Sequence, residues 1–260
     1  MARTLVAHNR AEDSENKVHD PEFARRVGFR GGLVPGVDVF GYLASAVLAE
    51  WGEEWLRRGS LEARFLKPVY DGDEVTVEAA GDDGTLEVRA LDGEGAIAAA
   101  GTAERRHRDA LPDPAAWPRR QAPDRRLPAE PEALGALTHL GALAPTVTAA
   151  DIAEQGAEIR EPSPYFTAAG VVHPAHLLRF ADQVLMANVA LPPWMHVSSR
   201  ARLFGLARAD EELLVQANRT ELFERKGHRF IRLDVLITGP AGPVMRVDPY
   251  TAIYDPAWNR

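Results

Sequence analysis

The stretch SENKVHDPEFARRVGFRGGLVPG, residues 14–36, is the part of the chain around which the fold is expected to form. It places the amide of Asn16 three residues before the imidazole of His19, and a glycine-rich turn then leads into an apolar run. Such a turn leaves backbone N–H groups unpaired at the positive end of a helix, where developing negative charge is favoured. A base beside an anion-stabilising turn is the outline of a reaction centre.

The residues on both sides of this stretch predict one long helix and an antiparallel sheet. Apolar residues recur at three- and four-residue spacing over 36–51, which predicts a mostly buried helix. Asp20 and Pro21 suit the N-cap and first position of a shorter helix over 21–27. Residues 4–7 predict a strand. Further strand-like runs, separated by Asp-Gly turns, cover 61–66, 74–79, 85–90 and 96–103.

A second unit repeats this order. Residues 171–190 open with Val171 and predict another helix with one apolar side, and strand-like runs follow at 196–204, 212–223, 230–238 and 244–254, with a hairpin turn over 224–228. Segments 33–36, 63–65 and 73–75 match 171–174, 201–203 and 211–213, always at an offset of 138 residues. A constant offset through helix and strands indicates an internal duplication.

The two units predict an α+β fold with three parts. Residues 1–108 form the first unit, and residues 146–260 form the second, which lacks the Asn-x-x-His motif. Residues 109–145 form a proline-rich linker, because prolines at six positions between 109 and 131 forbid regular structure there. The segment 161–165 of the second unit resembles a degenerate form of the motif.

The amino-acid composition excludes several classes of function. Hydrophobic residues make up 45% of the chain and charged residues 26%, as in a soluble globular protein, and the net charge of -8 argues against binding nucleic acid. There is no cysteine, so disulfides and thiolate chemistry are excluded, which favours a cytoplasmic location. No signal peptide and no run of about eighteen apolar residues is found, so neither secretion nor a membrane span is expected.

The motif in residues 14–36 resembles the signature of the MaoC-like acyl dehydratases and (R)-specific enoyl-CoA hydratases. That signature reads Asp-x-Asn-Pro-(Ile/Leu)-His, followed by an acidic residue, Phe-Ala and Gly-Phe. Ser14 stands where the family carries its catalytic aspartate, and the spacing from His19 to Phe23 is one residue shorter. The matching residues are Asn16, Val18, His19, Phe23-Ala24 and Gly28-Phe29. The resemblance implies a double hotdog fold, in which two long helices are each wrapped by an antiparallel sheet and one chain mimics a dimer.

Four residues of the motif are candidates for catalysis. His19 is the expected base, since an imidazole titrates near neutral pH; the alternative is a loop histidine that only packs or caps. Asn16 would orient substrate or water, or act as an ordinary turn residue. Ser14 could position a water, and Glu15 could supply the missing carboxylate if the loop shifts by one residue, although it could also be plain surface.

The glycine turn and the helix starts supply candidates for binding. Gly32 and Gly36 allow close backbone approach, and the N–H groups of Gly36 and Val37 are expected to bind a thioester carbonyl; a plain tight turn is the alternative. His173 begins the second helix and could face the substrate. It also forms a His-x-x-His pair with His176, but without a third ligand no metal site is predicted.

The leading functional hypothesis is reversible hydration of a 2-enoyl-CoA, or dehydration of a 3-hydroxyacyl-CoA, without a cofactor. The substrate would be carried on CoA or on acyl carrier protein, and the protein would be a monomeric pseudo-dimer or a homodimer. Asp38, in the first turn of the first helix, suits a contact with the helix dipole. The alternative is that Asp38 acts as the base or nucleophile of a hotdog thioesterase. A third possibility is an acyl-CoA-binding protein without activity.

Overall fold

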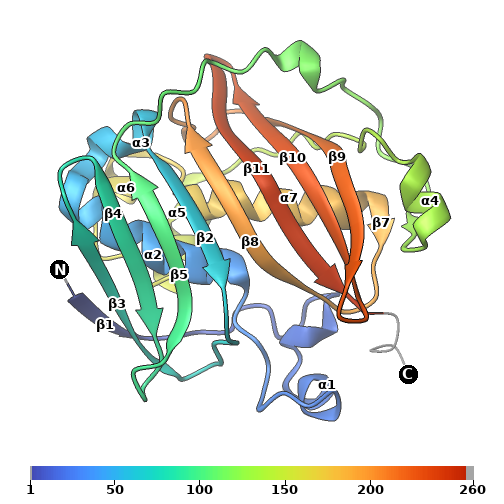
Figure 1. Ribbon diagram of the computed structural model, residues 1–260. Helices are drawn as coiled ribbons and strands as arrows, with labels where there is room; N and C mark the ends of the chain where they lie inside the picture. Colours follow the sequence, from blue (N-terminus) through green and yellow to red (C-terminus); the bar gives the residue numbers. More distant parts are fainter. Residues whose placement is uncertain (1, 256–260) are drawn as a thin grey trace.

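One antiparallel sheet runs across the whole molecule. The computed structural model describes residues 2–255, and within them the main sheet has the strand order β1-β3-β4-β5-β2-β8-β11-β10-β9 (Figure 1). The strands are β1 (Ala2–Val6), β2 (Ser60–Phe65), β3 (Glu74–Gly81), β4 (Thr85–Leu91), β5 (Ile97–Glu104), β8 (Trp194–Leu203), β9 (Leu214–Arg225), β10 (His228–Gly239) and β11 (Gly242–Tyr254). Each strand that the sequence predicts is present, with ends shifted by a few residues.

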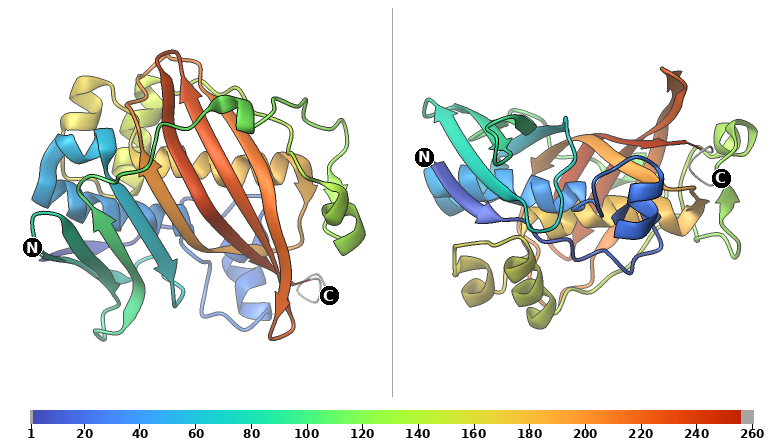
Figure 2. Two further views of the ribbon diagram at one scale, coloured as in Figure 1. Left: turned by 45° about the horizontal axis from the view of Figure 1, so that its top comes forward. Right: turned by 90° about the horizontal axis from the view of Figure 1, so that it is seen from below.

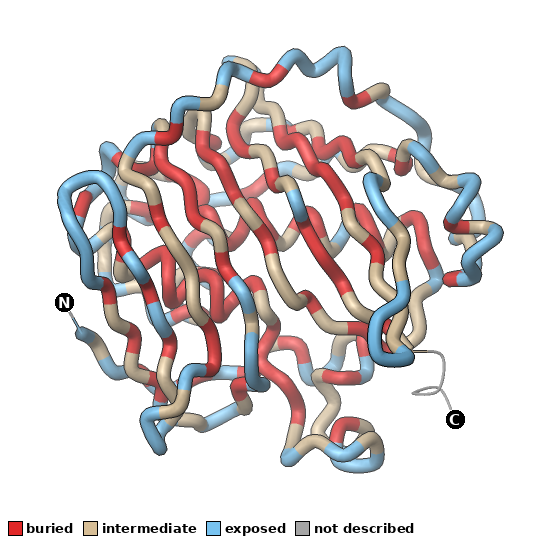
Figure 3. The backbone as a smooth tube through the Cα atoms, in the orientation of Figure 1, coloured by how far each residue is buried: buried red, intermediate tan, exposed pale blue. Residues whose placement is uncertain are grey.

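Two long helices lie side by side on one face of the sheet. They are α2 (Gly36–Trp51) and α7 (Pro174–Asn188), and Figure 2 shows them together beneath the strands. The core lies between these helices and the inward side chains of the strands, where buried positions alternate with exposed ones (Figure 3). Before them, α1 (Pro21–Arg26) begins as predicted, with the carboxylate of Asp20 accepting hydrogen bonds from the amides of Glu22 and Phe23.

The two halves are related by a twofold operation between β2 and β8. These strands pair antiparallel, with Ser60 opposite Arg202 and Arg64 opposite Ser198, a register that maps onto itself when each residue is exchanged for its counterpart 138 positions away. The same offset relates the isolated bridge between Leu33 and Tyr70 to the bridge between Val171 and Arg208. The duplication inferred from the sequence is therefore visible in the backbone hydrogen bonding, and the fold is a double hotdog.

The segment between the halves contains more regular structure than predicted. It includes the 3-10 turn η3 (Pro114–Ala116), the short strand β6 (Leu127–Pro128), which pairs with β7 (Val189–Ala190), and α4 (Pro131–Ala136). The indole of Trp117 is buried, and its N–H donates to the carbonyl of Asp234 in β10 at 3.0 Å. The segment is thus fastened to the second half of the sheet.

Several helices were not predicted. They are α3 (Trp55–Arg58), with the turn η2 (Gly52–Glu54) before it, α5 (Ala149–Glu158) and α6 (Tyr165–Ala169). Helix α5 starts with a capping box between Thr148 and Asp151. Among residues 2–255, none of the helices has the length and apolar character needed to cross a membrane.

Candidate active site

A cavity of about 220 Å³ lies where the two halves meet. The first half contributes the loop that carries the motif, the start of α2 and the loop after β2, and the second half contributes one residue of α7 and the beginning of β8. Its walls are mostly apolar, and its polar side chains come from both halves. The lining residues are Asn16, Val18, His19, Phe29, Leu33, Val34, Pro35, Gly36, Val39, Phe65, Leu66, Lys67, Pro68, Val69, Asp182, Trp194, Met195, His196 and Val197.

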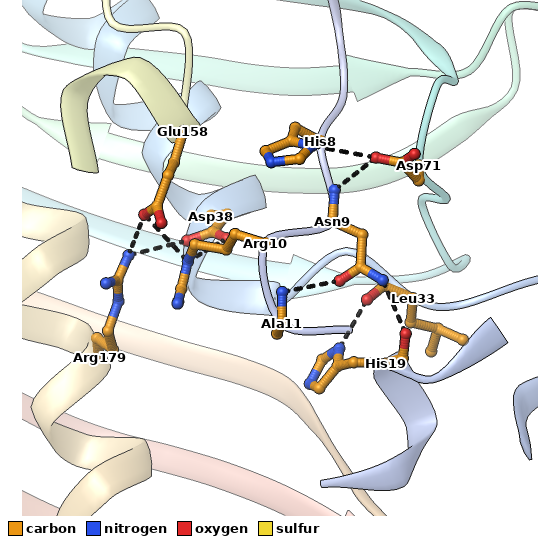
Figure 4. A network of polar contacts seen from close by, with 10 residues as sticks. All are labelled: His8, Asn9, Arg10, Ala11, His19, Leu33, Asp38, Asp71, Glu158 and Arg179. Carbon is orange, nitrogen blue, oxygen red and sulfur yellow. Dashed lines mark hydrogen bonds and ion pairs between the residues drawn. The ribbon is translucent and has the colours of Figure 1, made fainter. Parts of the chain in front are cut away.

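His19 faces this cavity as a neutral imidazole with a defined tautomer. It ends the 3-10 turn η1 (Lys17–His19), and its Nδ1 lies 2.6 Å from the carbonyl oxygen of Leu33 (Figure 4). Since a carbonyl only accepts hydrogen bonds, Nδ1–H is the donor and Nε2 carries the free lone pair. Burial lowers the pKa of His19 to about 4, against the opposing effect of the Leu33 hydrogen bond. At neutral pH the Nε2 atom is therefore available to accept a proton.

Gly32 and Asn9 hold the backbone of His19. The amide of Asn9 donates to the His19 carbonyl at 2.7 Å, as Figure 4 shows. A Cβ atom at Gly32 would lie 2.2 Å from the same carbonyl oxygen, so a side chain there cannot fit without moving the loop. Gly32 does not line the cavity itself; it allows the glycine turn to pack directly on the loop that positions His19.

Asn16 joins the motif loop to the second half. Its amide N–H donates to the carbonyl of Trp194 at 2.9 Å, and its side-chain oxygen accepts from the Trp194 amide at 3.2 Å. The same Nδ2 lies 3.4 Å from Nε2 of His19. Asn16 therefore fixes the loop against β8 and donates a long hydrogen bond to the unprotonated Nε2 of the imidazole.

Asp182 of α7 is a cavity residue that the sequence interpretation missed. Its Oδ1 accepts a hydrogen bond of 2.7 Å from the hydroxyl of Tyr250. Burial raises the pKa of Asp182 to about 7, although the bond from Tyr250 works in the opposite direction. Close to neutral pH this carboxyl group is present in both its protonated and its ionised form, as suits an acid-base group.

The start of α2 supplies backbone donors at the cavity wall. Within the described part of the chain, the N–H groups of Gly36 and Val37 have no hydrogen-bond acceptor. Gly36 lines the cavity, whereas Val37 is fully buried behind it. A Cβ at Gly36 would lie 3.2 Å from the Cβ of His196, so glycine lets β8 approach the helix closely. An oxyanion at this wall would meet the Gly36 amide at the positive end of the helix.

Three other predicted site residues do not line the cavity. The hydroxyl of Ser14 donates to the carbonyl of Asn16 at 3.2 Å. Glu15 forms an ion pair with Arg126 of the linker. His173 caps α7 by accepting from a backbone amide, and its Nε2 lies 3.4 Å from the carboxylate of Glu161. The structure brings His19, Asn16 and Gly36 together, and it places these three elsewhere.

Asp38 is enclosed in an ion cluster behind the start of α2. It is 1% exposed and lies 2.9 Å from Nε of Arg10 and 3.6 Å from a terminal nitrogen of Arg179. Both guanidinium groups also contact Glu158, at 3.2 and 3.0 Å (Figure 4). Two positive and two negative groups balance one another here. Asp38 lies outside the cavity lining, so the geometry does not favour it as a nucleophile or base.

Within residues 2–255, the position related to this cavity by the offset of 138 lacks two of its polar groups. The residue of α2 that corresponds to Asp182 is Ala44, and the residue of α7 that corresponds to Gly36 is Pro174, which has no N–H group. The mirror position therefore lacks both the carboxyl group and one backbone donor. Among residues 2–255, no group of three or more His, Asp or Glu side chains could hold a metal ion.

Two hotdog units in one chain, with His19 and Asp182 both lining an apolar cavity, define the protein as a double hotdog with a candidate acid-base site. Residues 15–95 match the family model of the MaoC like domain. The first half thus contains a MaoC-like domain, and the resemblance inferred from its motif is confirmed. A comparison with curated protein sequences finds no match.

Solved structures show the same fold along nearly the full chain. A MaoC domain protein from Chloroflexus aurantiacus J-10-fl, assigned by inference as a dehydratase, is similar with a TM-score of 0.65 and 12% identity, covering 98% of this chain and 94% of its own. Rv0216 of Mycobacterium tuberculosis is a conserved hypothetical protein with a double hotdog fold. Its TM-score is 0.64 at 12% sequence identity, and the match covers 97% of this chain and 95% of Rv0216. An oleoyl thioesterase of Lactobacillus plantarum, also assigned by inference, has a TM-score of 0.54 at 13% sequence identity. The match covers 98% of this chain and 96% of the thioesterase.

Proposed function

We propose that the protein catalyses the reversible addition of water to a 2-enoyl thioester carried on CoA or on acyl carrier protein. The observation that supports this most directly is that His19 and Asp182, one from each half, line the same apolar cavity. One is a neutral imidazole with an unprotonated Nε2, and the other is a carboxyl group with a pKa of about 7. Addition of water across a double bond needs such a pair, because one group removes a proton and the other donates one.

In the hydration direction, water attacks carbon 3 while Nε2 of His19 takes one of its protons. The electrons of the double bond move to the thioester oxygen, where the N–H of Gly36 stabilises the enolate. Protonated Asp182 then delivers a proton to carbon 2, which gives the 3-hydroxyacyl thioester. The proton on His19 returns to Asp182 through solvent. Asn16 acts as a positioning residue, because its amide holds the loop and contacts Nε2.

This assignment supplies the carboxyl group that the motif lacks at Ser14. In this proposal the acid comes from α7 of the second half instead of the loop of the first. It explains why Ser14 and Glu15 need not face the cavity. The apolar lining would hold the acyl chain, and Lys67 at the cavity wall is 54% exposed in its side chain, so it is accessible to a charged carrier.

The test is hydration of crotonyl-CoA, measured as loss of the enoyl absorbance. We expect His19→Ala and Asp182→Asn each to lower kcat by about 10²- to 10⁴-fold, with little change in the folded state. His8→Ala is the matched control, because His8 lies on the same segment, is partly exposed and does not line the cavity. Release of free CoA in place of hydration would indicate a thioesterase. Stabilisation by acyl-CoA without any turnover would indicate a binding protein.

A further inference from the structure

A second cavity of about 120 Å³ lies directly behind the first. Asn16 and Trp194 line both cavities, so these two residues form the wall between them. The remaining apolar lining of the second cavity is Phe23, Met186, Val189, Leu191, Pro192 and Pro193. The second space continues the first beyond a wall that two residues make, and its lining is more polar, because Glu15 and Lys17 join the apolar residues.

The wall is held by hydrogen bonds. The side chain of Asn16 makes two bonds to the backbone of Trp194, at 2.9 and 3.2 Å. Trp194 is 5% exposed and belongs to β8, where it pairs with Tyr254 of β11. These contacts fix the backbone of Trp194, and the burial of its side chain leaves the indole little room to move.

The linker contacts two residues that line the second cavity. Arg126 pairs with the carboxylate of Glu15 and donates to the carbonyl of Met186 at 3.3 Å. Both Glu15 and Met186 line the second cavity. This gives Glu15 a place in the structure, at the boundary of the second cavity and not in the first.

The size of the first cavity limits what it holds. Its volume of about 220 Å³ is below the roughly 300 to 1,000 Å³ of pockets that enclose drug-sized ligands. Joining it to the second cavity, of about 120 Å³, would bring the volume into that range. A short acyl chain therefore fits in front of the wall, and a long chain needs the space behind it.

We infer that Trp194, fixed by Asn16, determines acyl chain length by ending the acyl site at the wall between the two cavities. The inference rests on the proposed function in taking the ligand to be an acyl thioester. It assigns short-chain acyl thioesters as the substrate class of this site. The second cavity becomes usable for the end of the chain only when the indole is removed.

The experiment measures dissociation constants of saturated acyl-CoAs by titration calorimetry, from acetyl through butyryl, hexanoyl and octanoyl to decanoyl. In the wild type, each added methylene should tighten binding about fourfold until the chain reaches the wall, and longer chains should bind no better or more weakly. In Trp194→Ala the gain should continue through decanoyl. Trp194→Leu, which keeps apolar bulk and disturbs the fold less, should shift the limit in the same direction by a smaller amount.

Filling the second cavity provides the matched control. Met186→Trp alone should leave the wild-type chain-length profile unchanged, because wild-type ligands stop at the wall. Combined with Trp194→Ala, it should restore the short-chain limit. A wild-type affinity that keeps rising through decanoyl, a Trp194→Ala profile identical to that of the wild type, or no binding of any acyl-CoA would each overturn the inference.

Saturated chains cannot be hydrated, so this result is separate from the test of the proposed function. A length limit without hydration of crotonyl-CoA would leave the wall assigned and the hydratase proposal refuted. Hydration of crotonyl-CoA without a length limit set by Trp194 would support the hydratase proposal and refute the role of Trp194.

Discussion

Replacing Asp182 by asparagine should make the protein more stable at alkaline pH. The folded state raises the pKa of this carboxyl group from 3.8 to about 7, so the folded protein binds more protons than the unfolded chain between those values. The free energy of unfolding contributed by Asp182 is therefore greatest below about pH 4. It falls as the pH rises to about 7 and stays at its lower value above that.

The size of the effect follows from the same two values. The difference between 3.8 and about 7 corresponds to about 4 kcal/mol, at roughly 1.4 kcal/mol per pKa unit. Asparagine has no ionised form, and its side-chain oxygen still accepts the hydrogen bond from Tyr250. The variant should match the wild type at pH 4 and exceed it by up to about 4 kcal/mol at pH 8.

Urea unfolding of both proteins at pH 4, 6 and 8 would measure this difference. Comparing the two at each pH cancels the contribution of other titrating groups, including His19. A difference that does not change with pH would refute the argument that burial of Asp182 costs stability. If the proposed function is also correct, the stabilised variant should be inactive, because the buried carboxyl group that lowers stability is the one that the reaction uses.

Other predictions concern the loop, the ion cluster and the pH profile. Gly32→Ala should cost about 1–3 kcal/mol and lower activity by displacing His19, whereas Gly135→Ala, where nothing lies near the added methyl group, should be neutral or stabilising in the same urea titration. Arg10→Met should cost about 3–5 kcal/mol, since it leaves the buried carboxylate of Asp38 and the partly buried one of Glu158 with one partner; an unchanged unfolding midpoint would contradict this. Under the proposed function, the hydration rate should fall below about pH 4 as His19 is protonated and above about pH 7 as Asp182 ionises, and a flat profile would exclude this pair.

Most of the fold was predictable because its signals are local or repeated. The helix over 36–51 was predicted with its observed bounds from apolar spacing alone, and Asp20 with Pro21 marked the start of α1. The offset of 138 required only comparison of one half with the other. Helix α5 was missed because it buries only Ile152 and Gln155, and α6 because its five residues are too short to show a helical period.

The candidate site was only partly predictable, because half of it comes from a different part of the chain. The motif identified His19 and Asn16, but nothing in residues 14–36 indicates which residue of the second half faces them. One signal was available: Asp182 lies three and four residues from Leu185 and Leu178 on the apolar side of the second helix. A carboxylate in such a stripe is rarely buried without a function. His173 was selected for its place at the helix start, where the structure shows a capping role.

The pairing of β2 with β8 within one chain changes the effect of a single mutation on this molecule. In a symmetric dimer of identical chains, every substitution appears twice, so a change that improves one copy of a site also alters the other. Here the two copies are encoded separately and remain joined by one antiparallel strand pair. Ala44 therefore differs from Asp182, and Pro174 differs from Gly36, so each half contributes a part of the site that the other half lacks. Each half can therefore carry a different part of one cavity, and a substitution in either half alters that cavity once.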